Sequence, residues 1–228
     1  MRNVFNFEGP LFSGLSKMAD LLWLNILFIV CSLPIFTIGA SVTALYYVTL
    51  KMARDEEGYI TKSFFKSFRQ NFKQGTGIWL ILLAIGFVLI FDLRFVTNEA
   101  YAVMIPSEAI KNVLMVSTMA IGVIWTFVYI YVFPILAKFD NTVKNTMRNA
   151  FFMSIRHLPK TLLMVVIYLI PLVLMYFFNA AIVLVFIMFS MEAYFCSKNF
   201  VKIFDLYLPK EETATDNSEE RDEKEAEQ

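Results

Sequence analysis

The residue with the clearest potential for chemistry is Glu192, a single carboxylate inside a long apolar stretch. The run from Thr161 to Met191 before it carries no charge, and the next charged residue after it is Lys198. An ionisable side chain is costly in hydrocarbon, so residues of this kind either serve a function or extend toward the membrane interface. We take Glu192 as a candidate polar contact inside a helix bundle, with an interfacial residue as the alternative.

A second unusual feature is "SLPIFTIGAS", which begins at residue 32 in the middle of the uncharged run from Leu21 to Leu50. As one helix this run would be about 45 Å long, whereas the hydrocarbon of a bilayer is about 30 Å thick. Proline interrupts a helix, glycine loosens it, and nearby hydroxyl groups can satisfy the freed backbone groups or mark close helix packing. The predicted helix-break motif consists of Leu33, Pro34, Thr37 and Gly39.

A charged segment with a regular aromatic pattern follows this run. On a helical projection its phenylalanines share one face of about 100°, and its basic residues gather beside them. The pattern predicts an interfacial helix in the membrane plane, with the rings at the acyl boundary and the bases near anionic headgroups. The alternative is a surface brace without a ligand. The residues are Phe64, Phe65, Phe68 and Phe72 on the aromatic face, and Lys62, Lys66, Arg69 and Lys73 on the basic face.

Motifs for enzymatic chemistry are absent from the sequence. It contains no P-loop, no zinc-ligand cluster and no nucleophile elbow. His157, the single histidine, lies on a basic segment and fits an interfacial position better than a catalytic one. We therefore expect no enzymatic activity, no catalytic residue, and no bound cofactor or metal.

The composition indicates which elements carry these residues. Of 228 residues 58% are hydrophobic, and the mean hydropathy is +0.60. Uncharged runs of eighteen or more residues suffice to cross a bilayer as helices. The fold class is therefore all-α, a polytopic transmembrane helix bundle with about five spans and amphipathic interfacial helices. A full hairpin at Pro34 would give six spans, and Asn179 is the expected turn between the last two. The uncharged runs are Leu21 to Leu50, Gly75 to Phe91, Asn112 to Ala137 and Thr161 to Met191.

Charge divides the chain into three parts. We predict an N-terminal segment at 1–20, a transmembrane domain at 21–208, and a disordered acidic tail at 209–228 with nine acidic and three basic residues. The loops at 51–74 and 138–160 carry six and five Lys or Arg residues, whereas 96–110 carry none. Because such loops usually stay inside, we expect both basic loops and the C-terminus to be cytoplasmic. The side on which the N-terminus lies depends on the span count and stays open.

Several blocks of sequence, in order, resemble the YesL family of small integral membrane proteins of Gram-positive bacteria. The blocks are "LPIFTIGASVTALYYV", "ARDEEG", "FFKSFRQNF", "FPILAKFDNTVKNTMRNAF" and "LPKTLL". The resemblance covers residues from about Phe5 to Phe204, although many members have a proline where this chain has Ala40. It implies a multi-pass protein of the bacterial plasma membrane with no assigned activity and no established ligand-binding residues.

The resemblance also implies a role in carbohydrate uptake. Members of the family are often encoded beside binding-protein-dependent sugar transporters and glycoside-degrading enzymes. We therefore expect an accessory or regulatory component of oligosaccharide uptake, whose partners are the lipid bilayer and subunits of a sugar ABC transporter, and not nucleic acid. The alternatives are an independent small transporter or channel, and a membrane scaffold or lipid sensor. The substrate, the partner and the oligomeric state are not indicated by the sequence.

Overall fold

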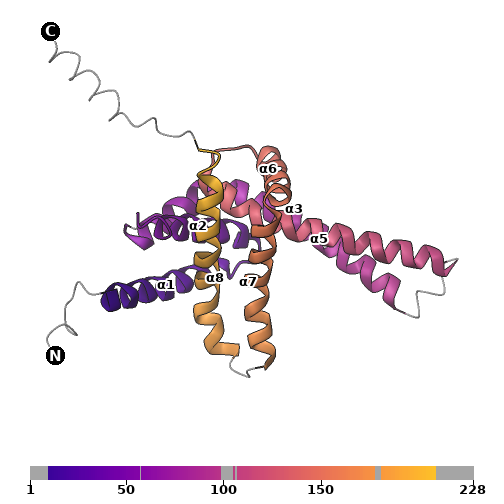
Figure 1. Cartoon of the computed structure of the whole chain (residues 1–228), viewed down its shortest axis with the longest axis horizontal. Helices are drawn as coiled ribbons and strands as arrows, with labels where there is room; N and C mark the ends of the chain where they lie inside the picture. The colour runs from indigo at the N-terminus through magenta and orange to yellow at the C-terminus, as the bar shows by residue number, and fades with distance from the viewer. Residues whose placement is uncertain (1–9, 57, 99–104, 106, 178–180, 209–228) are drawn as a thin grey trace, which may run out of the picture.

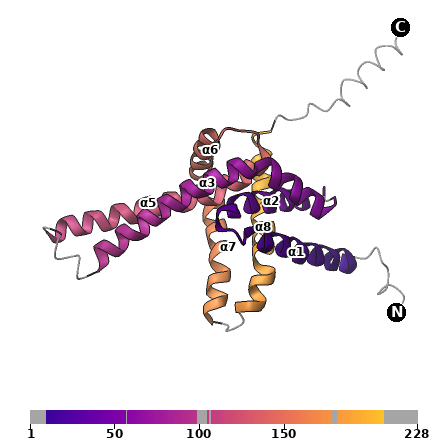
Figure 2. The same cartoon turned by 180° about the vertical axis from the view of Figure 1, so that it is seen from behind.

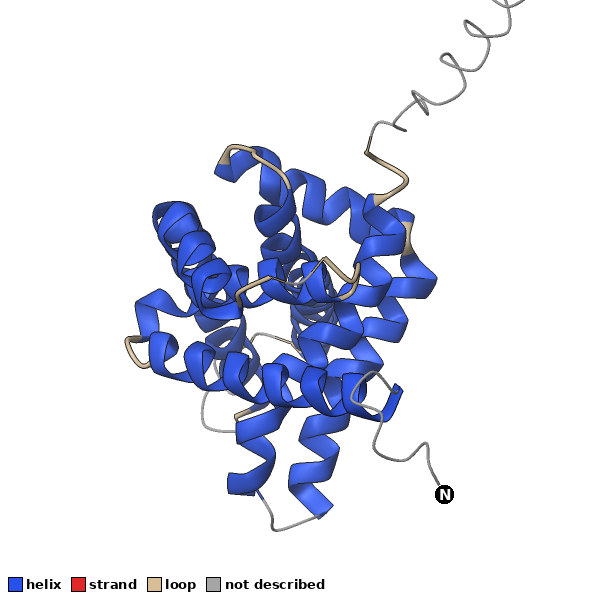
Figure 3. Cartoon of the chain, turned by 90° about the vertical axis from the view of Figure 1, so that its left-hand side faces the viewer, coloured by secondary structure: helices blue, strands red, loops and turns tan. Residues whose placement is uncertain are grey.

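The computed structural model describes residues 10–56, 58–98, 105, 107–177 and 181–208. Within these ranges the chain forms α-helices and one short 3-10 turn without any strand (Figure 3), which confirms the predicted all-α class. The elements are α1 (Pro10–Ser32), η1 (Ile35–Thr37), α2 (Ile38–Met52), α3 (Ile60–Thr97), α5 (Glu108–Lys138), α6 (Val143–Arg156), α7 (Leu158–Phe177) and α8 (Ala181–Phe204). Asn179 and the acidic tail at 209–228 lie outside the described residues.

Four stretches of the described chain are long and apolar enough to cross a membrane, and a bent helix pair can add a fifth. The four are Gly14–Ser32, Ile35–Met52, Ile60–Thr97 and Glu108–Lys138, and the bent pair is Val143–Arg156 with Leu158–Pro171. This range agrees with the predicted number of about five spans. The stretch through α2 differs from the others because 67% of it is buried inside the protein, whereas the most apolar 18 residues of α3 and of α5 are 11% and 17% buried. Membrane-length apolar helices with exposed sides are typical of an integral membrane protein.

Two long helical hairpins leave a common base in different directions (Figures 1 and 2). One consists of α3 and α5, and the other consists of α7 and α8. Helix α1 lies on the other side of the base, away from the α3–α5 hairpin. Because the two hairpins point in different directions, they cannot both be perpendicular to one bilayer. The length of α5 agrees, since its 31 residues span about 46 Å, well beyond about 30 Å of hydrocarbon.

The core lies in the base, where α2 packs against α3, α5 and α8. Its largest fully buried side chains are aromatic, among them Tyr46, Phe64, Tyr131, Phe133 and Phe200. Edge-to-face contacts join them across helices, for example between the rings of Tyr131 and Phe200, whose centroids are 5.0 Å apart. The hairpin arms, in contrast, expose aliphatic and aromatic side chains on most of their surface, as lipid contact requires.

The predicted interfacial helix is not a separate element. Its residues form the first third of α3. This helix is 38 residues long in total and continues without a break into the apolar arm. Part of its aromatic face packs on the protein: Phe64 is fully buried and stacks on half-buried Phe68 with 6.2 Å between ring centroids, whereas Phe65 is exposed. The segment is therefore not a helix of its own, because it holds no proline and Gly75 and Gly77 are tolerated inside a helix. Its position at the membrane interface stays a prediction.

A sharp bend does occur later in the chain, between α6 and α7. The axes of these helices differ by 101° across His157, and Pro159 in the first turn of α7 has no N–H to continue α6. Thr161 closes this corner, because its Oγ1 lies 2.7 Å from the carbonyl oxygen of Ser154 and 2.8 Å from the hydroxyl of Tyr131. The bend places α6 across the end of α5, with which it shares the core of the base.

The backbones of α2 and α3 approach each other closely at Gly39. We predicted that Gly39 loosens the chain within the break, but it is the second residue of α2 and has helical neighbours on both sides. A β-carbon placed there would lie 2.2 Å from the carbonyl oxygen of Gly75 and 2.5 Å from the Cβ of Trp79. Gly39 therefore allows close packing of two helices rather than flexibility.

Two ion pairs tie the loop after α2 to neighbouring helices. Lys17 of α1 donates to Asp55 at 2.5 Å, and Arg54 pairs with Asp205 just beyond α8. The hydrogen bond and the charge of Lys17 lower the pKa of the Asp55 carboxyl. Because α1 begins at Pro10, it runs through the boundary that we predicted between the N-terminal segment and the transmembrane domain at residue 20.

Candidate functional site

A pocket of about 460 Å³ lies where the two hairpins meet the helix break. Its walls come from the end of α1, the beginning of α2, and the inner faces of α5, α7 and α8. Most lining side chains are apolar, and the polar ones belong to Ser32, Tyr46, Tyr129, Tyr168 and Glu192. We call it the central pocket. Its size and its few polar groups in an apolar lining are typical of a small-molecule site.

The break supplies one wall of the central pocket. After α1 ends at Ser32, Pro34 adopts an extended conformation with φ −75° and ψ 115°, and η1 turns the chain into α2. The hydroxyl oxygen of Thr37 lies 2.6 Å from the carbonyl oxygen of Cys31 and 2.7 Å from that of Pro34. Trp79 of α3 donates from Nε1 to the carbonyl oxygen of Ile35 at 2.8 Å. The backbone groups freed by the break are thus satisfied, which holds the wall in place.

Glu192 brings a carboxyl group into this pocket from the middle of α8. It is half-buried, and within the residues that the structure describes it makes neither a hydrogen bond nor an ion pair. The hydroxyl oxygen of Ser32, which also lines the pocket, is buried and has no hydrogen-bond partner. Polar groups left unsatisfied in an apolar environment are expensive, so these two groups are candidates to bind a ligand.

Three tyrosines form the side of the pocket next to Glu192. The hydroxyl oxygens of Tyr46 and Tyr168 are 2.5 Å apart, and the ring of Tyr129 lies 6.5 Å from that of Tyr168 in an edge-to-face arrangement. Tyr129 also stacks on Trp125, with 5.6 Å between ring centroids. Each of the three tyrosines comes from a different helix, so the cluster joins α2, α5 and α7.

The arrangement suits binding more than bond chemistry. A carboxyl group can accept hydrogen bonds from hydroxyl or ammonium groups, and aromatic faces can pack against the carbon skeleton or the cationic head of the same ligand. A nucleophile paired with a base is not found among the described lining residues. In the described part of the chain, no group of three or more His, Cys, Asp or Glu side chains could hold a metal ion.

The structure brings together two features that the sequence treated separately. Leu33 of the break motif and Glu192 line the same pocket, whereas Pro34 and Thr37 shape its wall and Gly39 packs α2 on α3. The bases at the beginning of α3 lie elsewhere: Lys62, Lys66 and Arg69 are exposed and line a separate open groove with Tyr59 and Phe65. Lys73 is exposed one turn further along α3.

The tyrosines of the central pocket were missed by sequence reasoning. Ten tyrosines and 24 phenylalanines are spread through the chain, and aromatic residues are expected throughout a membrane protein at lipid contacts and interfaces. Tyr168 lies inside an uncharged run, whereas Tyr46 lies only four residues before the end of its run at Leu50. A phenol inside an apolar run requires a partner, and this signal could have identified Tyr168.

The comparisons with known proteins agree with the resemblance found in the sequence. Residues 21–93 match a family described as "Protein of unknown function, DUF624". This segment includes the break, Gly39 and the basic face of α3. No solved structure matches the chain.

Two proteins of Bacillus subtilis (strain 168) are similar to the chain over 146 residues. "Uncharacterized protein YteU" is 26% identical over 64% of this chain and 61% of its own length. "Uncharacterized protein YesL" is 25% identical over 64% of this chain and 64% of its own length. The chain thus spans less than two thirds of either relative. These findings confirm the resemblance to the YesL family: the chain is similar to the uncharacterised proteins YesL and YteU.

Proposed function

We propose that this integral membrane protein is an accessory or regulatory component of carbohydrate uptake that binds a small ligand in its central pocket and catalyses no reaction. The observation that carries the proposal is the unpaired carboxyl group of Glu192 in a pocket built by both hairpins and the helix break. A ligand there would contact α1, α2, α5, α7 and α8 at once. Binding would therefore favour one arrangement of the hairpins over others, which is how a ligand biases a two-state protein.

Carbohydrate is proposed because the chain resembles the YesL family, whose members are often encoded beside sugar transporters. Subunits of a sugar ABC transporter in the bacterial plasma membrane are the proposed partners. The exposed apolar sides of the hairpin arms offer room for contacts with other transmembrane helices, for example around Phe87, Phe91 and Val113, which are 69%, 64% and 67% exposed. Such contacts form within the bilayer by close packing.

The test compares uptake of labelled oligosaccharides in cells that carry the wild-type chain or Glu192→Gln in place of it. Gln has nearly the same shape but replaces the carboxyl group by an amide that cannot ionise, so the protein should still fold. We expect the initial uptake rate to fall at least threefold for Glu192→Gln. The matched control is Glu108→Gln, because Glu108 is exposed at the beginning of α5 and lies outside the central pocket. Equal uptake by all three proteins would contradict the proposed role.

An independent transporter is the second candidate function. The central pocket adjoins a helix interrupted at Pro34, and interrupted helices commonly form the substrate sites of transporters. Purified protein in liposomes should then move a sugar without a partner, and Glu192→Gln should reduce the flux. Flux from the chain by itself would favour this candidate, whereas uptake only together with co-purified permease subunits would favour the accessory role.

The orientation in the membrane gives a further prediction. Docking to a cytoplasmic ATPase requires that the base of the protein, with its Lys and Arg residues, faces the cytoplasm. In a chain with Cys31→Ala and Cys196→Ala, single cysteines at the exposed positions Lys66 and Lys144 should resist an impermeant thiol reagent in intact cells. Both should react once the cells are permeabilised. A cysteine at the exposed position Glu108 should react from outside, and the reverse pattern would place the base on the outer face.

A further inference from the structure

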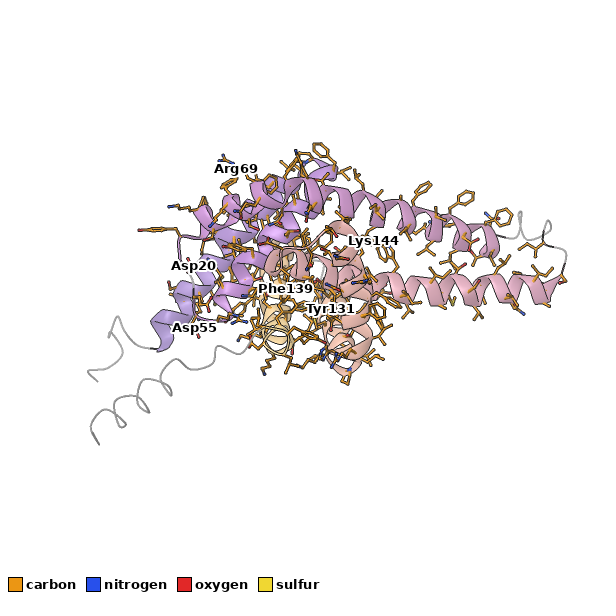
Figure 4. All side chains as sticks on the ribbon, turned by 90° about the horizontal axis from the view of Figure 1, so that it is seen from above. Asp20, Asp55, Arg69, Tyr131, Phe139 and Lys144 are labelled. Atoms are coloured by element: carbon orange, nitrogen blue, oxygen red, sulfur yellow. The ribbon has the colours of Figure 1, made fainter. Side chains whose placement is uncertain are left out.

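A second cleft lies in the polar base of the protein, away from the central pocket. It has a volume of about 790 Å³ and is formed by α2, α3, the end of α5 and the beginning of α6. Figure 4 shows this base from above, with Phe139 near its middle and Arg69 at its edge. Five amide side chains line the cleft, so we call it the amide cleft. They are Gln70, Asn71, Gln74, Asn141 and Asn145.

The amide groups of the cleft are largely unused by the protein itself. Asn71 donates from Nδ2 to Ser67, 3.1 Å from its carbonyl oxygen and 3.2 Å from its Oγ. The side chains of the other four amides make no hydrogen bond to any residue that the structure describes. Gln74, Asn141 and Asn145 are nevertheless half-buried. Half-buried amides without internal partners leave both donors and acceptors available to a ligand.

The chemistry of the lining selects a class of ligand. An amide side chain donates and accepts hydrogen bonds at once, and so does a hydroxyl group. The charged side chains of the lining are Lys138 and Asp140, one of each sign and both exposed. An anion would find more bases on the exposed groove that holds Lys62, Lys66 and Arg69. Tyr47 and Phe139 add apolar ring surface, against which the carbon face of a sugar can pack.

We propose that the amide cleft binds a neutral polyhydroxylated ligand, of which mono- and disaccharides are the simplest class. The biological relevance of this inference rests on the proposed role in carbohydrate uptake. The choice of ligand class rests on the amide side chains of the cleft. The cleft suits such a ligand better than the mostly apolar central pocket does, because each sugar hydroxyl must replace hydrogen bonds to water. If the basic loops are cytoplasmic, this site would sense sugar that has entered the cell.

Saturation-transfer NMR on the full chain in nanodiscs tests the inference with glucose, galactose, maltose and cellobiose as probes. We expect at least one saccharide to bind, and Asn145→Ala to weaken its binding about fivefold or more, since loss of one hydrogen bond has an effect of about that size. The matched control is Asn149→Ala. Asn149 lies one turn further along α6, is equally half-buried, and lines a different pocket beside Arg156.

Gln70→Ala serves as a second variant, because Gln70 is exposed and its replacement leaves no cavity in the core. It should also weaken saccharide binding. Saccharide binding that is unchanged in Asn145→Ala and Gln70→Ala would overturn the assignment of the site. Absence of any saccharide signal from folded wild-type protein would overturn the ligand class. Neither result decides the role in uptake, which depends on Glu192→Gln in the central pocket.

Discussion

Replacing Gly39 by alanine is expected to destabilise the protein more than any other single methyl addition proposed for it. The new Cβ would lie 2.2 Å from the carbonyl oxygen of Gly75 and 2.9 Å from its carbonyl carbon. Both atoms belong to the backbone of α3, so no side-chain rotation can relieve the contact. Overpacking of this kind costs about 1–3 kcal/mol, occasionally more, and we expect at least about 3 kcal/mol here.

Thermal unfolding of the purified protein in detergent measures the effect. A loss of about 3 kcal/mol lowers the midpoint by about 6–12 °C in a protein of this length. Gly75→Ala should have a smaller effect, because its Cβ would meet Ala40 at 3.0 Å. Gly77→Ala is the matched control on the same helix: no atom lies within 4 Å of its Cβ, and alanine favours a helix over glycine by about 1 kcal/mol.

The expected order of stability is therefore Gly77→Ala at or above wild type, then Gly75→Ala, then Gly39→Ala. Equal midpoints for the three variants would contradict the close crossing of α2 and α3. A low midpoint for Gly77→Ala together with a normal one for Gly39→Ala would reverse the assignment of the two glycines. Either result would also contradict the position of the start of α2, which forms one wall of the central pocket.

Replacing Glu192 by leucine is expected to separate stability from function. Leucine fills similar space without a carboxyl group that lacks an internal partner, so the desolvation penalty of about 1–3 kcal/mol disappears. The unfolding midpoint should then rise by about 2–12 °C. Oligosaccharide uptake should fall at least as far as with Glu192→Gln, because the polar group that would meet a ligand is lost. Residues kept for function at the expense of stability behave in this way.

Glu108→Leu is the control for this prediction. Glu108 is exposed in the first turn of α5, where an acidic side chain stabilises the helix by about 0.3–1 kcal/mol. Its replacement should slightly lower the midpoint and leave uptake unchanged. A marked loss of stability in Glu192→Leu would show that the carboxyl group supports the fold, and would remove the argument that it serves a ligand.

Membrane-length helices and the break at Pro34 could be predicted from the sequence because both depend on local chemistry. Long uncharged runs cannot be solvated by water, and a proline without an N–H ends a helix wherever the chain continues. The order of the YesL-like blocks identified the resemblance in the same local way. These features need no knowledge of which helices become neighbours.

The sequence could not determine which face of an amphipathic segment meets protein and which meets lipid. Phe64 and Phe68 of α3 have the spacing of a lipid-facing stripe, but α2 covers this part of α3 and buries Phe64. Lipid and protein interior are equally apolar, so the helical period is the same in both cases. Gly39 raises the same difficulty, because the residue type does not distinguish a glycine in a helix break from a glycine at a close helix crossing.

The sites depended on the tertiary structure for a related reason. Leu33 and Glu192 are separated by most of the chain but line one pocket, and the amides of α3 and α6 converge only because the chain turns between α5 and α6. Sequence by itself determined that this protein is an α-helical membrane protein with a broken first helix and one costly carboxylate. Only the packing of α2 against α3, α5 and α8 decided where that carboxylate lies and which side chains surround it, because contacts between distant segments follow from shape and not from local composition.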